Sequence, residues 1–85
     1  MSKLTFSERA WNDYVYWQSQ DKKTIEKLNA LLKEIQRTPF TGSGKPEPLK
    51  HDKSGRWSRR INETDRLVYL VNGDTIEITQ CKGHY

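Results

Sequence analysis

Glu47 is the first residue of this sequence whose setting suggests chemistry, because it lies between two prolines in the segment Lys45–His51 (KPEPLKH). Each proline fixes its own φ and restricts the residue before it, so we expect Glu47 on a stiff, extended backbone among basic side chains. A carboxylate held in this way could serve as a general base. Alternatively, Glu47 is an ordinary loop carboxylate that balances the charge of the neighbouring lysines.

A histidine and a phenol follow closely after the last predicted strand, in the ending Cys81–Tyr85 (CKGHY). Because this ending is so short, we expect His84 and Tyr85 to stay near the edge of the sheet. A histidine with an unperturbed pKa of about 6.5 is the usual acid or base near neutral pH. The alternative is a disordered tail, as short unattached termini often are.

Arg66 could bind a phosphate group, since it opens a predicted strand directly after the turn at residues 63–65. It could equally pair with an acidic residue of that turn and have only a structural role. Depending on the register of the turn, either Arg60 or Ile61 shares a face of the sheet with Arg66, because a slip of one residue exchanges the two faces of a strand. The sequence leaves both questions open.

Most of the positive charge lies in residues 43–60, where six basic side chains accompany two acidic ones, and the net charge of the whole chain is +4. Such a stretch, interleaved with aromatic and histidine side chains, is typical of a surface that meets phosphates and bases. The alternative is a solvated basic surface that only aids solubility. His51 lies in the same stretch, and the candidate RNA-binding residues are Lys45, Lys50, Lys53, Arg56, Trp57, Arg59 and Arg60.

The length of 85 residues allows one domain, residues 1–85, and the 33% hydrophobic content predicts a thin core. One cysteine, Cys81, and two histidines cannot supply the four protein ligands of a usual zinc site, so we expect no metal and no cofactor. No apolar run approaches the roughly 20 residues needed to cross a bilayer, and the start lacks the apolar stretch of a signal peptide. We therefore expect a soluble, cytoplasmic protein without a membrane partner.

The N-terminal half predicts a short strand and two helices. Alternation over residues 3–6 predicts the strand, and Ser7 in the N-cap position predicts a helix over residues 8–18. Asp21 caps a second helix that ends at Thr38-Pro39, because a proline disfavours helical geometry in the residue before it. An apolar stripe at helical spacing marks the buried face of this helix: Ile25, Leu28, Leu31, Leu32 and Ile35.

The C-terminal half predicts a long loop and a meander of strands. The loop, residues 39–48, holds three prolines and two glycines, and strands are expected over residues 49–51, 56–62, 66–71 and 75–82. Asn72-Gly73 is a strong signal for a hairpin between the last two. This order of elements predicts an α+β domain, with two N-terminal helices packed on one face of a mostly antiparallel four- to five-stranded sheet.

Three blocks, residues 38–51 (TPFTGSGKPEPLKH), 54–61 (SGRWSRRI) and 65–69 (DRLVY), carry a family pattern. Residues 11–14 (WNDY), 16–18 (YWQ) and the final HY extend it over essentially the whole chain. In all of these segments the sequence closely resembles the YoeB toxins of the RelE-like superfamily, which belong to bacterial toxin-antitoxin systems. The resemblance implies a RelE-like form of the α+β fold.

The resemblance further implies a toxin that acts as a ribosome-dependent mRNA endoribonuclease, entering the ribosomal A site and cutting the message within or beside the codon. The implied catalytic residues are Glu47 as carboxylate, Arg66 as phosphate-binding arginine, His84 as histidine and Tyr85 as terminal tyrosine. Lys50 and Arg60 match basic residues that contact RNA or the transition state. Gly83 departs from the pattern, since relatives carry a bulkier, often aromatic, side chain there. It is expected to loosen the tail, which would then become ordered only when RNA or an antitoxin occupies the site.

The implied reaction agrees with the chemistry of these residue types. Cleaving RNA without a metal requires a base to remove the 2′-hydroxyl proton, a cation to neutralise charge on the phosphate and an acid to protonate the departing 5′-oxygen. Glu47, Arg66 and His84 match these needs in that order. The expected product is a 2′,3′-cyclic phosphate.

The resemblance implies three partners: a YefM-like antitoxin, a ribosome with mRNA in the A site, and a second copy of the chain in a homodimer. The net charge of +4 suits a disordered acidic antitoxin segment. Two other functions stay open, because fold alone does not decide function. One is a non-catalytic toxin of the same fold that inhibits DNA gyrase by binding. The other is a plain RNA-binding module that stacks bases on Trp57.

Overall fold

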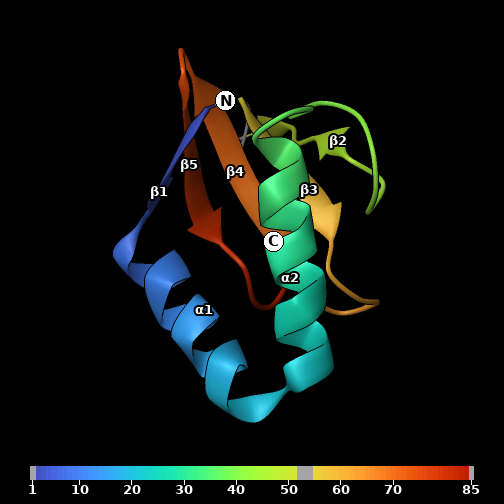
Figure 1. The fold of residues 1–85 in the computed structure, drawn as a ribbon. Coiled ribbons are helices and arrows are strands. Elements are labelled where there is room, and N and C mark those ends of the chain that lie inside the picture. Colours follow the sequence, from blue (N-terminus) through green and yellow to red (C-terminus); the bar gives the residue numbers. More distant parts are fainter. Residues whose placement is uncertain (1, 52–54, 85) are drawn as a thin grey trace.

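The computed structural model describes residues 2–51 and 55–84 and contains two helices and a five-stranded sheet within them (Figure 1). The helices precede most of the sheet in the chain. In chain order the elements are β1 (Lys3–Phe6), α1 (Glu8–Gln20), α2 (Lys22–Ile35), β2 (Glu47–Pro48), β3 (Arg56–Arg60), β4 (Arg66–Asn72) and β5 (Thr75–Gln80).

The strand order across the sheet is β1-β5-β4-β3-β2. The pair β1 and β5 is parallel, and the other three pairs are antiparallel. Both helices lie on one face of the sheet, which leaves the other face without a helix (Figure 1). The predicted α+β class, with two helices on one face of a mostly antiparallel sheet, is therefore confirmed. None of the described helices is long and apolar enough to cross a membrane.

Two polar caps determine where the helices begin. The Ser7 hydroxyl accepts a hydrogen bond from the Ala10 N–H at 3.1 Å, and the Asp21 carboxylate accepts one from the Thr24 N–H at 3.1 Å. These bonds satisfy backbone donors that have no partner inside the helix. Both predicted starts are confirmed, although α1 runs two residues past the predicted end and α2 stops at Ile35, ahead of the predicted end.

The core lies between the helices and the inner face of the sheet. The stripe on α2 packs against buried side chains of β4 and β5, with Leu4 and Phe6 of β1 at the margin. Burial of this apolar surface is the main force that holds the helices on the sheet. The buried residues of this core cluster are Ala10, Trp17, Leu28, Leu31, Leu32, Ile35, Ile61, Leu67, Tyr69, Ile76, Ile78 and Cys81.

The strand predicted at residues 49–51 is wrong, because the pairing with β3 occurs earlier, at Glu47–Pro48. The Leu49 N–H still donates to the Arg56 carbonyl at 2.9 Å, but His51 then adopts a left-handed backbone with φ of 61°. That conformation turns the chain away from an extended path. The prolines are tolerated because β2 is an edge strand.

Arg59 is completely buried on the inner face of the sheet, where its charge is paired. Its Nη1 lies 2.5 Å from Glu34 Oε1 of α2, and its Nε donates to the Tyr69 hydroxyl at 3.1 Å. Burial raises the pKa of Tyr69, so its hydroxyl stays protonated and able to donate. The predicted RNA contact of Arg59 is therefore wrong, because a buried guanidinium with these partners has no surface to offer.

The same guanidinium fastens the loop between α2 and β2 onto the sheet. Tyr69 assists by donating its hydroxyl proton to the Pro39 carbonyl at 2.6 Å, and the Gly44 carbonyl accepts from the Arg60 N–H at 2.7 Å. The loop thus has a defined path to Glu47. The carbonyl oxygens that accept from Arg59 are those of Thr38, Thr41 and Ser43.

Glu34 gives this cluster an acid-sensitive contribution to stability. The hydrogen bond from the Ser43 N–H, with a smaller contribution from Arg59, lowers the pKa of the Glu34 carboxyl below its usual 4.5. These contacts outweigh desolvation, which acts in the opposite direction. Because the folded pKa is lowered, the contribution is present above the unfolded pKa and is lost as pH falls through the folded value. We expect the difference in Tm between the wild type and Glu34→Gln to shrink below about pH 4.5. Thermal unfolding from pH 7 to pH 3 tests this, and a constant difference would contradict it.

Candidate active site

The sheet face without helices carries a row of four residues, one from each of β2 to β5. Glu47 pairs with Ser58, Ser58 with Val68, and Val68 with Gln80. Directly paired residues of neighbouring antiparallel strands point to the same face of a sheet. Glu47 therefore projects onto the outer face about 10 Å, or two strand spacings, from Val68.

Arg60 and Arg66 form the neighbouring row, since they are directly paired between β3 and β4. This register resolves the alternative left open by the sequence, because Arg60 rather than Ile61 shares the face of Arg66. Arg66 is 7% exposed, and its Nη1 donates to the carbonyls of Asn62 at 2.8 Å and Asp65 at 3.2 Å. These neutral acceptors orient the guanidinium without cancelling its charge.

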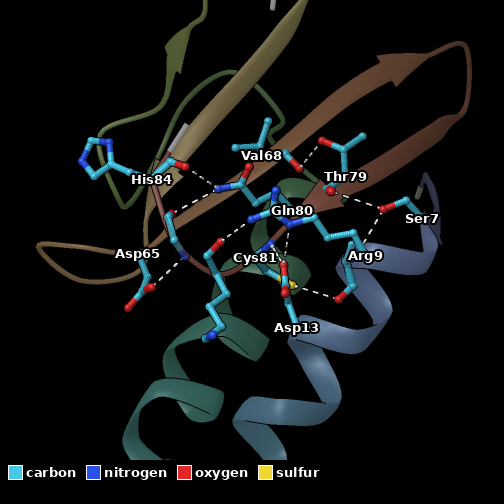
Figure 2. A network of polar contacts seen from close by, with 12 residues as sticks. Ser7, Arg9, Asp13, Asp65, Val68, Thr79, Gln80, Cys81 and His84 are labelled. Atoms are coloured by element: carbon cyan, nitrogen blue, oxygen red, sulfur yellow. Dashed lines mark hydrogen bonds and ion pairs between the residues drawn. The ribbon is translucent and has the colours of Figure 1, made fainter.

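The C-terminal tail brings His84 next to Arg66. The Arg66 N–H donates to the Gly83 carbonyl at 3.0 Å, and the Gly83 N–H donates to Asp65 Oδ1 at 2.7 Å. Figure 2 shows the contact of Asp65 with the tail, and the His84 imidazole points out of the network and away from α1. Glu47, Arg66 and His84 are thus brought to one face of the sheet, two of them by strand register and the third by the tail.

Gly83 does not loosen the tail in the way its residue type suggests. Its φ is +84°, a left-handed conformation that glycine adopts without a steric penalty, and both its N–H and its carbonyl are hydrogen-bonded. Cys81, the first residue of the tail, is also held, because Trp17 Nε1 donates to its carbonyl at 2.7 Å. The structure therefore argues against the loose tail expected for the free protein.

Cys81 itself is not a candidate nucleophile. Its side chain is fully buried, and its Sγ lies 3.3 Å from the Ala10 carbonyl. Burial, with a smaller contribution from the Asp13 carboxylate, raises the pKa of the thiol to about 12. Since the thiolate is the reactive form, this group is inert at neutral pH.

The basic side chains expected to bind RNA divide between the two faces of the sheet. Arg56 shares the outer face with Ser58, and Lys45 and Lys50 are exposed on either side of Glu47. Trp57 instead lies on the inner face, half-buried, with its ring centroid 4.8 Å from that of Phe40. Base stacking on Trp57 at this face is therefore not supported. The predicted residues Lys53 and Tyr85 lie outside the described residues.

A model of the YoeB-like toxins of bacterial type II toxin-antitoxin systems matches residues 6–85. The chain belongs to the YoeB family. The toxin YoeB of Escherichia coli strain K12 is 57% identical over 83 residues, which cover 98% of this chain and 99% of that toxin.

Solved structures of the YoeB family agree with this assignment. The YoeB dimer from Staphylococcus aureus is 49% identical, with a TM-score of 0.91 over 99% of this chain and 98% of that chain. A heterotetrameric YoeB–YefM toxin-antitoxin complex from the same organism is 49% identical, with a TM-score of 0.90 over 100% of this chain and 99% of that chain. The fold and the family are thus established by independent comparisons.

Two polar residues at the site were not found by sequence reasoning. Asp65 accepts from the tail, and Gln80, only 6% exposed, completes the row that begins at Glu47. Alternation along β5 places Gln80 on the face of the apolar residues Ile76 and Ile78, and a polar residue at such a position is a signal that could have drawn attention to it. Its position on the outer face depends on a strand irregularity that the sequence does not reveal.

Proposed function

We propose that this YoeB-family toxin is a ribosome-dependent mRNA endoribonuclease, which cuts the message in the ribosomal A site and so inhibits translation. The observation that carries the proposal is the convergence of Glu47, Arg66 and the His84 tail on one face of the sheet. Exposed basic side chains around this face suit an RNA strand, whose phosphates they would contact.

In the proposed reaction Glu47 removes the proton from the 2′-hydroxyl, whose oxygen then attacks the adjacent phosphorus. The Arg66 guanidinium stabilises the charge that develops on the phosphate oxygens, and its carbonyl partners keep it oriented. His84 protonates the departing 5′-oxygen as the P–O bond breaks. The products are a 2′,3′-cyclic phosphate and a 5′-hydroxyl end, and Tyr85 is proposed to complete the site.

Cell-free translation with primer extension on the message tests this proposal directly. Cuts at codons held in the A site, with cyclic phosphate ends and no cuts in free mRNA, are the expected result. Inhibition of DNA supercoiling by gyrase without RNA cuts would instead favour the gyrase-binding alternative. Ribosome or RNA binding without any cut would favour a plain binding module.

The partners of the S. aureus relatives suggest partners for this chain. We propose that a YefM-like antitoxin binds it in the cytoplasm and covers the outer face, and that two copies form a homodimer. The solved structures of a YoeB dimer and of a heterotetrameric YoeB–YefM complex from this organism support the proposal. A disordered acidic segment would be attracted by the basic surface and would order on binding.

Lys45 and Lys50 are expected to act in binding rather than in chemistry. Changing both to glutamine should weaken ribosome association and lower the slope of log affinity against log salt by about 0.7 to 0.9 for each lost phosphate contact. Ribosome-binding measurements from 50 to 200 mM salt give this slope. Lys22→Gln with Lys23→Gln is the matched control, because these exposed lysines open α2, away from the outer face. Equal slopes for both double variants would make the basic side chains near Glu47 only a solvated surface.

A further inference from the structure

Gln80 is a buried amide whose position is produced by a β-bulge. Tyr69 of β4 pairs with Ile78 of β5, and the preceding residue, Val68, pairs with Gln80. Thr79 is therefore an extra residue in β5. Ile78 is buried in the core, and regular alternation would return Gln80 to the same inner face. The extra residue instead places Gln80 opposite Val68 on the outer face, as bulges near functional sites often do.

Both N–H donors of the Gln80 side chain bind backbone carbonyls of the tail. Nε2 donates to the Gly83 carbonyl at 3.2 Å and to the His84 carbonyl at 3.2 Å (Figure 2). A side-chain amide has two donors on this nitrogen, so each carbonyl can receive one. The two contacts therefore hold the peptide groups on both sides of the His84 Cα, the atom that carries the imidazole side chain.

Asp65 completes this arrangement from the other side of the tail. Its Oδ1 accepts from the Gly83 N–H at 2.7 Å, while the Arg66 N–H donates to the Gly83 carbonyl at 3.0 Å. Gly83 is therefore held at both its N–H and its carbonyl. A glycine would otherwise give the tail wide conformational freedom, so these contacts restrict the backbone that carries His84.

We propose that Gln80 is a positioning residue that places the His84 imidazole beside Arg66 for proton transfer to the leaving oxygen. This inference rests on the proposed function in its use of His84 as the acid. Gln80 takes no proton and touches no substrate. It acts by keeping His84 within reach of the 5′-oxygen, where a displacement of about 1 Å costs up to about 100-fold in rate.

The central variant is Gln80→Leu, which keeps a similar size and removes both donors. We expect single-turnover cleavage on saturating ribosomes to fall about 10- to 100-fold, with ribosome affinity unchanged. A double-mutant cycle with His84→Gln separates positioning from general destabilisation. If Gln80 acts through His84, the Gln80 change should cost almost nothing once His84 is already absent. Additive losses would overturn the inference.

Thr79→Val is the matched control on the same strand end. It removes the Thr79 hydroxyl bond to the Val68 carbonyl at 3.3 Å and leaves the tail contacts in place. We expect it to keep wild-type cleavage. Gln80→Met provides a second variant without donors in case Gln80→Leu does not fold. Wild-type cleavage by a folded donor-free variant would overturn the positioning role.

Amide hydrogen exchange reads the tail without relying on cleavage. In Gln80→Leu the Gly83 and His84 amides should exchange faster than in the wild type, while those of β4 stay unchanged. If the wild type fails to cut mRNA on ribosomes, the proposed function falls and the role of Gln80 in proton transfer falls with it. If the wild type cuts and tail exchange is the same in both proteins, Gln80 does not hold the tail and only this inference is overturned.

Discussion

Glu47→Gln is expected to lower the rate of mRNA cleavage on the ribosome by about 100- to 10,000-fold, the range for loss of a general acid or base. Glutamine keeps the size and hydrogen-bonding capacity of the side chain but cannot take the 2′-hydroxyl proton. The backbone should not change, because Glu47 is held by its pairing with Ser58 and by the prolines beside it. Single-turnover primer extension at saturating ribosome concentration measures the loss.

Glu77→Gln is the matched control for this prediction. Glu77 is exposed, and its pairing with Leu70 places it on the same outer face at the opposite side of the sheet. The charge change is identical, so its effect on long-range attraction to ribosomes should be similar. We expect its cleavage rate to stay within about twofold of the wild type, as for a surface substitution away from the site. Full cleavage by Glu47→Gln would leave Glu47 an ordinary loop carboxylate.

The helices could be predicted from the sequence because their signals are local. Ser7 and Asp21 each satisfy a donor three residues further along the same chain, so the caps can be identified without knowing the fold. The strand predicted at residues 49–51 failed for the opposite reason. Its true position depends on the pairing of Glu47 with Ser58, a contact between residues that are eleven positions apart in the sequence.

The candidate site could be predicted by residue type but not by arrangement. Arg59 and Arg60 are adjacent and identical in chemistry, and only the register of β3 against β4 decides which of them is buried. The signal for burial of Arg59 is spread over Glu34 and the loop at residues 38–43, far away in the sequence. Gln80 was missed because one extra residue in β5 reverses the face expected from alternation.

Arg59→Met is expected to lower the free energy of unfolding by about 3 kcal/mol, near the lower end of the range for breaking a buried ion pair. Methionine fills similar volume, but three loop carbonyls lose their donor and Glu34 loses its cation. The cost stays near the lower end because the Glu34 side chain is 34% exposed and keeps the Ser43 N–H. Urea unfolding at pH 7 measures the change.

Arg60→Met, one residue further, should affect cleavage rather than stability. Arg60 is exposed on the outer face opposite Arg66, so its loss should change stability by less than about 0.5 kcal/mol. It should nevertheless weaken cleavage, because one of the cations that meets the RNA phosphates is gone. Arg59→Met, where it remains folded, should bind ribosomes like the wild type. Two results together would contradict this division: a destabilised fold in Arg60→Met, and a loss of ribosome binding in a folded Arg59→Met. The assignment of a structural role to the inner face and of RNA binding to the outer face would then be wrong.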